Sequence, residues 1–492
     1  MHFRLRPVVA AALLIGSAAG ALAQSADTLR AAAEKAITTN PDVTARFNAL
    51  RASRDAVDVV RGGFLPRVDV NANVGQDETR ITTRNPATES ITRSGVGASV
   101  TQLLWDGLGT RHEVERLSHE RLARYFELLD TTEQIALEAA RAQLDVQRYR
   151  RLVKLAEDSY VQHRYAFQQI RSRVNAGVGR GVDLEQAGAR VALAESNLTT
   201  ELANLHDVTA RYQRIVGEAP PANLPPPVQL RQGVPASAAE AMTVALRQSP
   251  AISASIEALR SARSAADSRG SLFQPRVEAR VRTQAGRNLD GTQDQSRSSS
   301  AEIVLNWNLY NGGSDQARVR QQANLVNQAA DLRDRACRDV RQVAAIAYND
   351  TRKLTDQLVY LDRNTLAIEK ARDAYRQQFD IGQRSLLDLL NAENEVYTAR
   401  RAYANAEFDL ALAYARTHAA MNQLAATLGI ARIDQAAADV AANWAQGEDA
   451  PSRCPVVVAD VLPTDRAELD ARAQRMLDAA PQPAAPGPAR RP

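Results

Sequence analysis

The stretch FLPRV at residues 64–68 returns 209 positions later as FQPRV at residues 273–277. A second pair of matching stretches, LWDG at residues 104–107 and LYNG at residues 309–312, is separated by 205 positions. A repeated order of landmarks along one chain is the mark of a duplicated structural unit. The fold must therefore be built from two copies of one unit, one of which has lost four residues between its landmarks.

The two copies conserve the length of one long segment. Gly107 and Gly177 are 70 residues apart, and so are Gly312 and Gly382. No proline interrupts residues 110–176 or 314–381, and their apolar residues recur every three or four positions, which is typical of a coiled-coil seam. We predict two helical rods of roughly 100 Å. Each turns back at its glycine into a second helix, at about 183–216 and 386–428.

Alternating residues predict a β-hairpin in each unit, at 66–105 and 275–310. Val68, Val70 and Val74 share one face of the first strand, while Arg67, Asp69 and Asn71 occupy the other. Strands of about ten residues are long enough to cross an outer membrane. A shorter helix precedes each hairpin and is expected to begin at Asn40-Pro41 and at Ser249-Pro250, where a capping residue stands before proline.

Four strands are too few to close a membrane barrel, because the smallest have about eight. An open sheet edge in lipid is very costly, so strands in a membrane would require several chains to share one barrel. Four aromatic residues at the helix-side ends of the strands fit an interfacial girdle: Phe64, Trp105, Phe273 and Tyr310. The alternative is a small soluble sheet whose apolar faces pack on a core.

The first residues indicate a secretory signal peptide. Arg4 and Arg6 precede an apolar run at residues 8–15, and Ala21-Leu22-Ala23 is a small-residue cleavage site. The predicted mature chain then begins near Gln24, with 59 basic against 57 acidic residues. That balance gives no reason to expect a nucleic-acid partner.

Two cysteines, Cys337 and Cys454, are too few for a disulfide scaffold, and the position of Cys337 on an apolar stripe favours a buried, inert thiol. Beyond Ile430 the sequence is rich in Ala, Pro and Asp, which predicts a mostly disordered tail. The expected organisation is a signal peptide (1–23), a first unit (24–219) with its tip near 177–183, a Pro-rich linker (220–235), a second unit (236–430) with its tip near 382–388, and a tail (431–492).

No motif indicates an enzyme. Residues 176–181 are glycine-rich but lack the Lys-Ser/Thr of a phosphate-binding loop. His112-Glu113 begins like a zinc-protease helix, yet Arg116 stands where the second histidine would be needed. We therefore expect no catalytic residues, no cofactor and no metal.

In this order and twice over, the landmarks resemble the TolC family of outer-membrane exit ducts, across about residues 26–430. The resemblance implies a mixed α+β membrane protein of Gram-negative bacteria. Three chains would form a homotrimer, each giving four strands to one twelve-stranded β-barrel in outer-membrane lipid, continued by a periplasmic α-helical tunnel. It also implies two partners, a periplasmic adaptor (membrane fusion) protein and an inner-membrane transporter.

The resemblance assigns roles to the tips of the helical hairpins. The periplasmic gate would comprise Phe379, Arg384, Asp388 and Asn391, with Asp183 at the first tip. Relatives carry a second acidic ring where this chain has Asn391, and an aromatic hydroxyl where it has Phe379, so we hypothesise a looser gate. Asp388 and Asp183 could instead cap the returning helices, and the two roles are compatible. Exposed tip residues would contact the adaptor: Gly177, Leu184, Gly382 and Leu389.

Three functions remain open at this point. The first is an export duct, with type I protein secretion through an ABC transporter favoured over drug or metal efflux through a proton-driven pump, because the details around Gly177 and the tail resemble secretion members. The second is a periplasmic coiled-coil scaffold without a pore. The third, a self-standing porin, is disfavoured because rods of roughly 100 Å are excess for passive diffusion.

Overall fold

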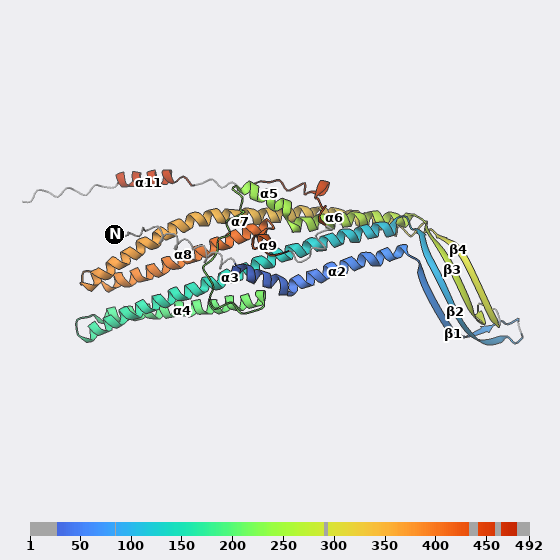
Figure 1. Ribbon diagram of the computed structural model, residues 1–492, viewed down its shortest axis with the longest axis horizontal. Coiled ribbons are helices and arrows are strands. Elements are labelled where there is room, and N and C mark those ends of the chain that lie inside the picture. Colours follow the sequence, from blue (N-terminus) through green and yellow to red (C-terminus); the bar gives the residue numbers. More distant parts are fainter. Residues whose placement is uncertain (1–26, 84, 290–293, 432–440, 458–463, 480–492) are drawn as a thin grey trace, which may run out of the picture. The chain divides into compact units, whose positions relative to one another are not determined.

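A computed structural model describes residues 27–83, 85–289, 294–431, 441–457 and 464–479. The chain divides into two units, residues 1–456 and 457–492. The first contains the long helices and the sheet, and the second contains α11 (Arg466–Asp478), which has no buried residue. Figure 1 shows the strands continuing from one end of the helices of the first unit, while the turns between the long helices lie at the other end.

Two helices of equal length dominate the first unit. α3 (Gly109–Asn175) and α7 (Ser314–Asp380) each have 67 residues, so both ends are related by the 205-residue spacing seen in the sequence. α3 packs along α4 (Gly181–Val216), and α7 packs along α8 (Leu386–Ala420). α8 is shorter than the segment predicted from the sequence, because the chain turns at Asn422, whose φ is positive, before the short helix α9 (Leu424–Thr427).

Shorter helices cover the strand-side half of the rods. Residues 27–39 are helical, and α2 (Pro41–Arg61) lies on α3. α5 (Ala238–Gln248) contacts α7, while α6 (Pro250–Ser268) packs between α3 and α7. The expected caps are present: the Asn40 side chain accepts from the backbone N–H of Asp42 at 2.9 Å, and Ser249 caps α6.

The four strands form one antiparallel sheet in the order β1-β2-β3-β4. Their bounds are Arg67–Arg80, Thr88–Trp105, Arg276–Arg287 and Gln295–Asn306. The hairpins of the two repeats therefore pair directly through β2 and β3. β4 ends before the segment 307–309 that the alternation had included, because β3 begins only at Arg276 and offers it no partner. Trp307 instead donates its indole N–H to the carbonyl of Phe273 at 3.2 Å.

The register gives the sheet one apolar and one polar face. Val70 lies opposite Ala98, Val100 opposite Val281, and Ala279 opposite Ile303. These apolar side chains remain uncovered: Val70 is 74% exposed and Ile303 is 73% exposed. The other face carries charged and polar residues such as Arg67, which lies opposite Thr101. A wide exposed apolar face on an ordered sheet marks a surface that meets lipid or another chain.

Part of the C-terminal region is folded onto the helices, which differs from the mostly disordered tail expected from the sequence. We call residues 441–456 the strap. Trp444 donates its indole N–H to Glu257 of α6 at 2.7 Å, and Asp449 accepts from Arg260 of α6 at 2.7 Å. Arg453 donates to Asp334 of α7 at 2.7 Å. The strap thus joins α6 to α7, and residues 432–440, 458–463 and 480–492 of the predicted tail lie outside the described residues.

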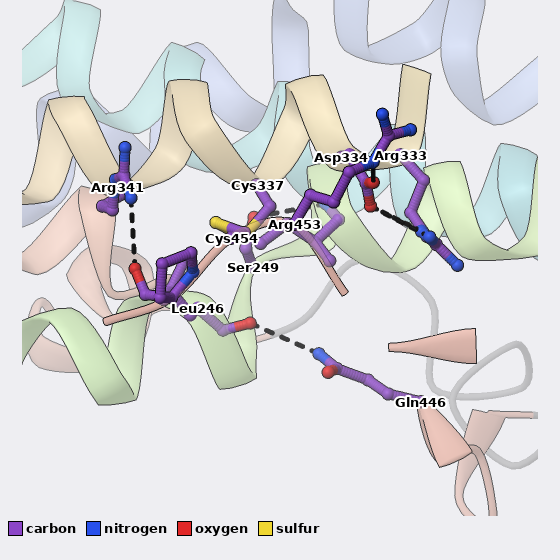
Figure 2. The surroundings of a disulfide bond; sticks show 11 residues. Leu246, Ser249, Arg333, Asp334, Cys337, Arg341, Gln446, Arg453 and Cys454 are labelled. Atoms are coloured by element: carbon purple, nitrogen blue, oxygen red, sulfur yellow. Dashed lines mark hydrogen bonds and ion pairs between the residues drawn. A yellow bond between two sulfur atoms is a disulfide. The ribbon is translucent and has the colours of Figure 1, made fainter. Parts of the chain in front are cut away.

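The strap is also held covalently. Cys337 of α7 and Cys454 form a disulfide, which Figure 2 shows between the Arg453–Asp334 ion pair and Arg341, whose guanidinium donates to the carbonyl of Pro455 at 3.1 Å. Gln446 adds a hydrogen bond to the carbonyl of Leu246 in α5 at 3.3 Å. The expectation of an inert free thiol at Cys337 was therefore wrong. The apolar surroundings of Cys337 were predicted correctly. Cys454 shares these surroundings, and the sequence did not indicate this because the two cysteines lie 117 residues apart.

Candidate functional site at the helical tips

The two turns that end the long helices have the same backbone geometry. Gly177 and Gly382 both adopt positive φ, at 74° and 79°. The amide of Gly177 donates to the carbonyl of Val174 at 2.9 Å, and that of Gly382 donates to the carbonyl of Phe379 at 3.0 Å. Each glycine follows the end of a long helix and adopts the left-handed backbone conformation. Residues with a Cβ atom disfavour this conformation, so glycine suits both positions.

Asp388 completes the start of α8. Ser385 is the N-cap, and its hydroxyl accepts from the amide of Asp388 at 3.2 Å while donating to the Asp388 carboxylate at 2.9 Å. Arg384 lies 3.7 Å from the same carboxylate and 4.4 Å from the ring centre of Tyr375. The expected capping role of Asp388 and Asp183 was therefore wrong: Ser385 caps α8 and Asp388 only holds its hydroxyl, while α4 has no side-chain cap. At the first tip, Asp183 pairs with Arg180 at 3.3 Å.

Phe379 lies inside the molecule and not on an open surface. Only 7% exposed, it joins an apolar cluster whose other buried members are Ala166, Ile170, Ala187, Leu386, Leu389 and Leu390. The Arg173 guanidinium stands 4.9 Å from the centre of the Phe379 ring. Because the members come from α3, α4, α7 and α8, this tip cluster holds the two hairpins together.

The exposed tip residues differ from those expected. Leu389 is 5% exposed and belongs to the tip cluster, so its expected role as an exposed contact was wrong. The uncovered apolar side chains of the two tips are Val178, Val182, Ile381 and Leu387. Gly177 and Gly382 are exposed, and Leu184 is half-buried against the cluster.

Asn391 makes a contact between the hairpins. Its side-chain oxygen accepts from Arg190 of α4 at 2.9 Å. The position expected to weaken an acidic ring is therefore also a hydrogen-bond acceptor for the neighbouring hairpin.

A buried carboxylate that the sequence analysis missed lies just above the tip cluster. Glu393 is 7% exposed, pairs with Arg372 at 3.1 Å and also binds Arg376. Arg376 donates in turn to Gln162 of α3 at 2.8 Å, so this network links α7, α8 and α3. The sequence signal was available, because Glu393 continues the stripe of Leu386, Leu389 and Leu390 that faces the interior.

Further ion pairs join the two hairpins along their length. Arg401 of α8 binds Glu201 of α4 at 2.8 Å, and Arg148 of α3 binds Asp409 of α8 at 2.6 Å. Arg151 of α3 also pairs with Glu407 of α8. With Arg190–Asn391 and Arg376–Gln162 these contacts form a ladder between the hairpins. This ladder fixes how the two hairpins pack together from the tips to the level of Arg148 and Asp409.

The described residues carry no sign of a metal centre or a membrane-spanning helix. Within the described ranges, no group of three or more His, Cys, Asp or Glu side chains is arranged to hold a metal ion. No helix among them combines the length and the apolar character needed to cross a bilayer.

Long paired hairpins, a small sheet with one exposed apolar face and polar contacts at the tips define a channel-type transport protein. The model of the family described as "Outer membrane efflux protein" matches residues 32–218 and 242–423. The chain belongs to this TolC-like family of outer-membrane channels, which are not enzymes and which extend a large helical part into the periplasm of Gram-negative bacteria.

Two relatives illustrate the range of the family. The outer membrane efflux protein BepC of Brucella suis is 25% identical over 425 residues, covering 86% of this chain and 91% of BepC. The alkaline protease secretion protein AprF of Pseudomonas aeruginosa is 26% identical over 336 residues, 64% of this chain and 67% of AprF. 

Solved structures share the fold at lower identity. The Campylobacter jejuni CmeC outer membrane channel aligns with a TM-score of 0.73 and 13% identity, over 84% of this chain and 88% of CmeC. The outer-membrane channel OprN aligns with a TM-score of 0.71 and 21% identity, over 82% of this chain and 92% of OprN.

Proposed function

We propose that three copies of this chain form the outer-membrane exit duct of a tripartite export system. The observation that carries the proposal is the sheet: its apolar face is uncovered, and its edge strands β1 and β4 have no outer partner among the described residues. Edges of this kind are stable in lipid only when another chain pairs with them. Three four-stranded sheets would close one twelve-stranded barrel, as in the family that the chain resembles.

The sheet would sit in the membrane between aromatic residues. Phe64, Trp105, Phe273 and Tyr310 are 43–84% exposed and flank the junctions between strands and helices. Aromatic side chains favour the interface between lipid and water, so these four would contact lipid head groups on the periplasmic side. The helical hairpins would continue the barrel as a periplasmic tunnel whose entrance is formed by the tips.

The tips would serve as both gate and docking surface. Three copies of Asp388 would form one acidic ring at the entrance, and the amide at Asn391 would leave the gate looser than a second acidic ring. A periplasmic adaptor would contact Gly177, Gly382 and Leu184, together with the exposed apolar residues Val178, Val182, Ile381 and Leu387. These exposed side chains support docking because they lie at the free ends of the hairpins.

The gate proposal predicts that Asn391→Asp changes conductance. A second carboxylate would add negative charge at the entrance and pair with Arg190, so we expect lower single-channel conductance and stronger block by multivalent cations. Asn394→Asp, three residues further along α8, is the matched control. Unchanged conductance and block in Asn391→Asp would contradict the looser gate.

Two substrate classes are proposed for the duct. Type I protein secretion, with an ABC transporter as the inner-membrane partner, is supported by the likeness to a protein whose name records alkaline protease secretion. Small-molecule efflux with a proton-driven pump is the second candidate, favoured by the longer alignment with a protein named for efflux. Deletion of the gene tests both: loss of a secreted protein from the culture medium supports the first, and raised sensitivity to toxic compounds supports the second.

The duct itself is tested on purified protein. We expect an SDS-resistant trimer that dissociates on boiling and forms discrete channels in planar bilayers. A soluble monomer or dimer without conductance would favour the coiled-coil scaffold instead.

A further inference from the structure

A groove with a volume of about 450 Å³ is lined by the start of α6, the end of α8 and the middle parts of α3 and α7. This volume lies in the range of pockets that hold small molecules. Its floor is apolar and comes from α3, α7 and α8: Leu137, Val340, Val343, Ile346, Ala347 and Ala420. The tip contacts use none of these residues, and the strap reaches only the edge of the groove at Val340.

The floor presents uncovered apolar side chains. Val343 and Ile346 are 56% and 52% exposed, although the neighbouring Ala347 is buried. At about 100° per residue they lie roughly 120° and 180° around α7 from Cys337, which faces the strap. Val343 and Ile346 therefore lie on a different face of α7 from the strap, while Val340, at the edge of the groove, also packs against the cluster that contains Cys337 and Cys454.

The groove is lined by more acidic than basic side chains. Four carboxylates line it, from Asp130, Glu133, Asp339 and Asp350, against the one guanidinium of Arg416. The two on α7 have nearby cations, Arg335 at 3.5 Å from Asp339 and Lys353 at 3.7 Å from Asp350. Glu133 accepts from the amide of Ala425 at 3.3 Å.

Of the four carboxylates in the groove, Asp130 has the weakest hydrogen-bond and ion-pair partners. Its side chain accepts from the neutral amide of Gln134 at 2.7 Å. The nearby cation, Arg46 of α2, attracts the carboxylate of Asp130 but forms its ion pair with Glu127 at 2.9 Å, and within the described part of the chain no cation forms an ion pair with Asp130. Burial raises the pKa of Asp130, which means that the anion has lost hydration that nothing nearby fully replaces. A cation entering the groove would supply that missing partner.

We propose that this groove binds lipophilic cations, with the positive charge beside Asp130 and apolar groups against Val343 and Ile346. Charge complementarity selects the sign of the ligand, and the exposed aliphatic floor selects its apolar character. The placement of the groove along an export path rests on the proposed function, whereas the binding rests on the groove alone.

The test uses the full-length protein in lipid nanodiscs and two ions of the same shape and opposite charge, tetraphenylphosphonium and tetraphenylborate. Isothermal titration against empty nanodiscs should give saturable binding of the cation and none of the anion. Asp130→Asn should weaken cation binding about 5- to 20-fold, the scale of one partly screened charge pair. Val343→Trp, at an exposed position, should fill the groove and abolish binding without unfolding the protein.

Asp356→Asn, on α7 outside the groove, is the matched control and should bind the cation like the unaltered protein. Equal binding of both ions, or cation binding that survives Val343→Trp and Asp130→Asn, overturns the proposal. Absence of saturable binding in an intact, conducting trimer also overturns it, because a second copy then covers the groove. Cation binding by a protein that neither trimerises nor conducts would keep the groove and reject the proposed duct.

Discussion

The two tips have the same turn but opposite surroundings. At the 205-residue spacing, Ser385 and Leu386 replace Arg180 and Gly181, and Leu390 and Glu393 replace Glu185 and Gly188. The second tip is consequently capped and buried against the first hairpin, whereas α4 begins without a side-chain cap and exposes its first turn. The two repeats keep the same length and path of their long helices. The substitutions at the second tip give α8 a side-chain cap and a buried first turn, which α4 lacks.

Removal of the Glu393 carboxylate should have the largest effect on the stability of the second tip relative to the first. Glu393→Ala would leave Arg372 and Arg376 without their shared partner, and we expect a loss of about 3 kcal/mol in local stability. Hydrogen exchange across residues 386–400 measures it. Glu395→Ala, at an exposed position on the same helix, should stay within about 0.5 kcal/mol. Equal protection in the two variants would show that the buried network does not anchor α8.

Loss of the disulfide should loosen the strap from α7. The first repeat has no corresponding segment among the described residues. Cys454→Ser removes a crosslink between residues 117 apart in sequence, and we expect a cost of about 2–4 kcal/mol. Limited proteolysis of the strap and thermal unfolding measure it. The variant with serine at both positions should behave like the single variant, since each lacks the same bond. Unchanged proteolysis in both would mean that ion pairs alone retain the strap.

The cap at the second tip contributes a smaller effect. Ser385→Ala should destabilise the first turn of α8 by about 1 kcal/mol, because the amide of Asp388 loses its acceptor. The reciprocal change, Arg180→Ser, should stabilise the first turn of α4 and make the two tips more alike. Hydrogen exchange of the two turns checks both variants. A shift in only one tip would show that burial, and not the cap, separates them.

Acid should weaken the contacts of the strap, which has no counterpart in the described part of the first repeat. Burial alone would raise the pKa of Asp334, of Asp449 and of Glu257, but hydrogen bonds from arginines and, for Glu257, from His119 and Trp444 outweigh it and lower each pKa. Their contribution is complete above the ordinary carboxyl pKa of about 4 and is lost as the pH falls through the lowered folded-state values. Proteolysis of the strap should therefore increase below about pH 4. A pH-independent rate would contradict these contacts.

The elements themselves were predictable because their signals are local. Alternation predicted the strands, proline and glycine marked helix ends, and the equal spacing predicted equal rods. The contacts between segments were not predictable in this way. The Cys337–Cys454 bond joins positions 117 apart with no motif, although an even number of cysteines in an exported chain was a usable hint. Leu389 was assigned to the surface from its position in the resembled family, while the helical stripe to which it belongs faces the interior.

The central claim is that the sheet is completed by other copies of the chain. A photo-crosslinking residue at Val70 in β1 tests it in membranes, with mass spectrometry to identify the joined peptides. The account predicts covalent dimers and trimers in which β1 of one copy is joined to β4 (Gln295–Asn306) of another. Crosslinks confined to single chains, with protein present in the outer membrane, would contradict it.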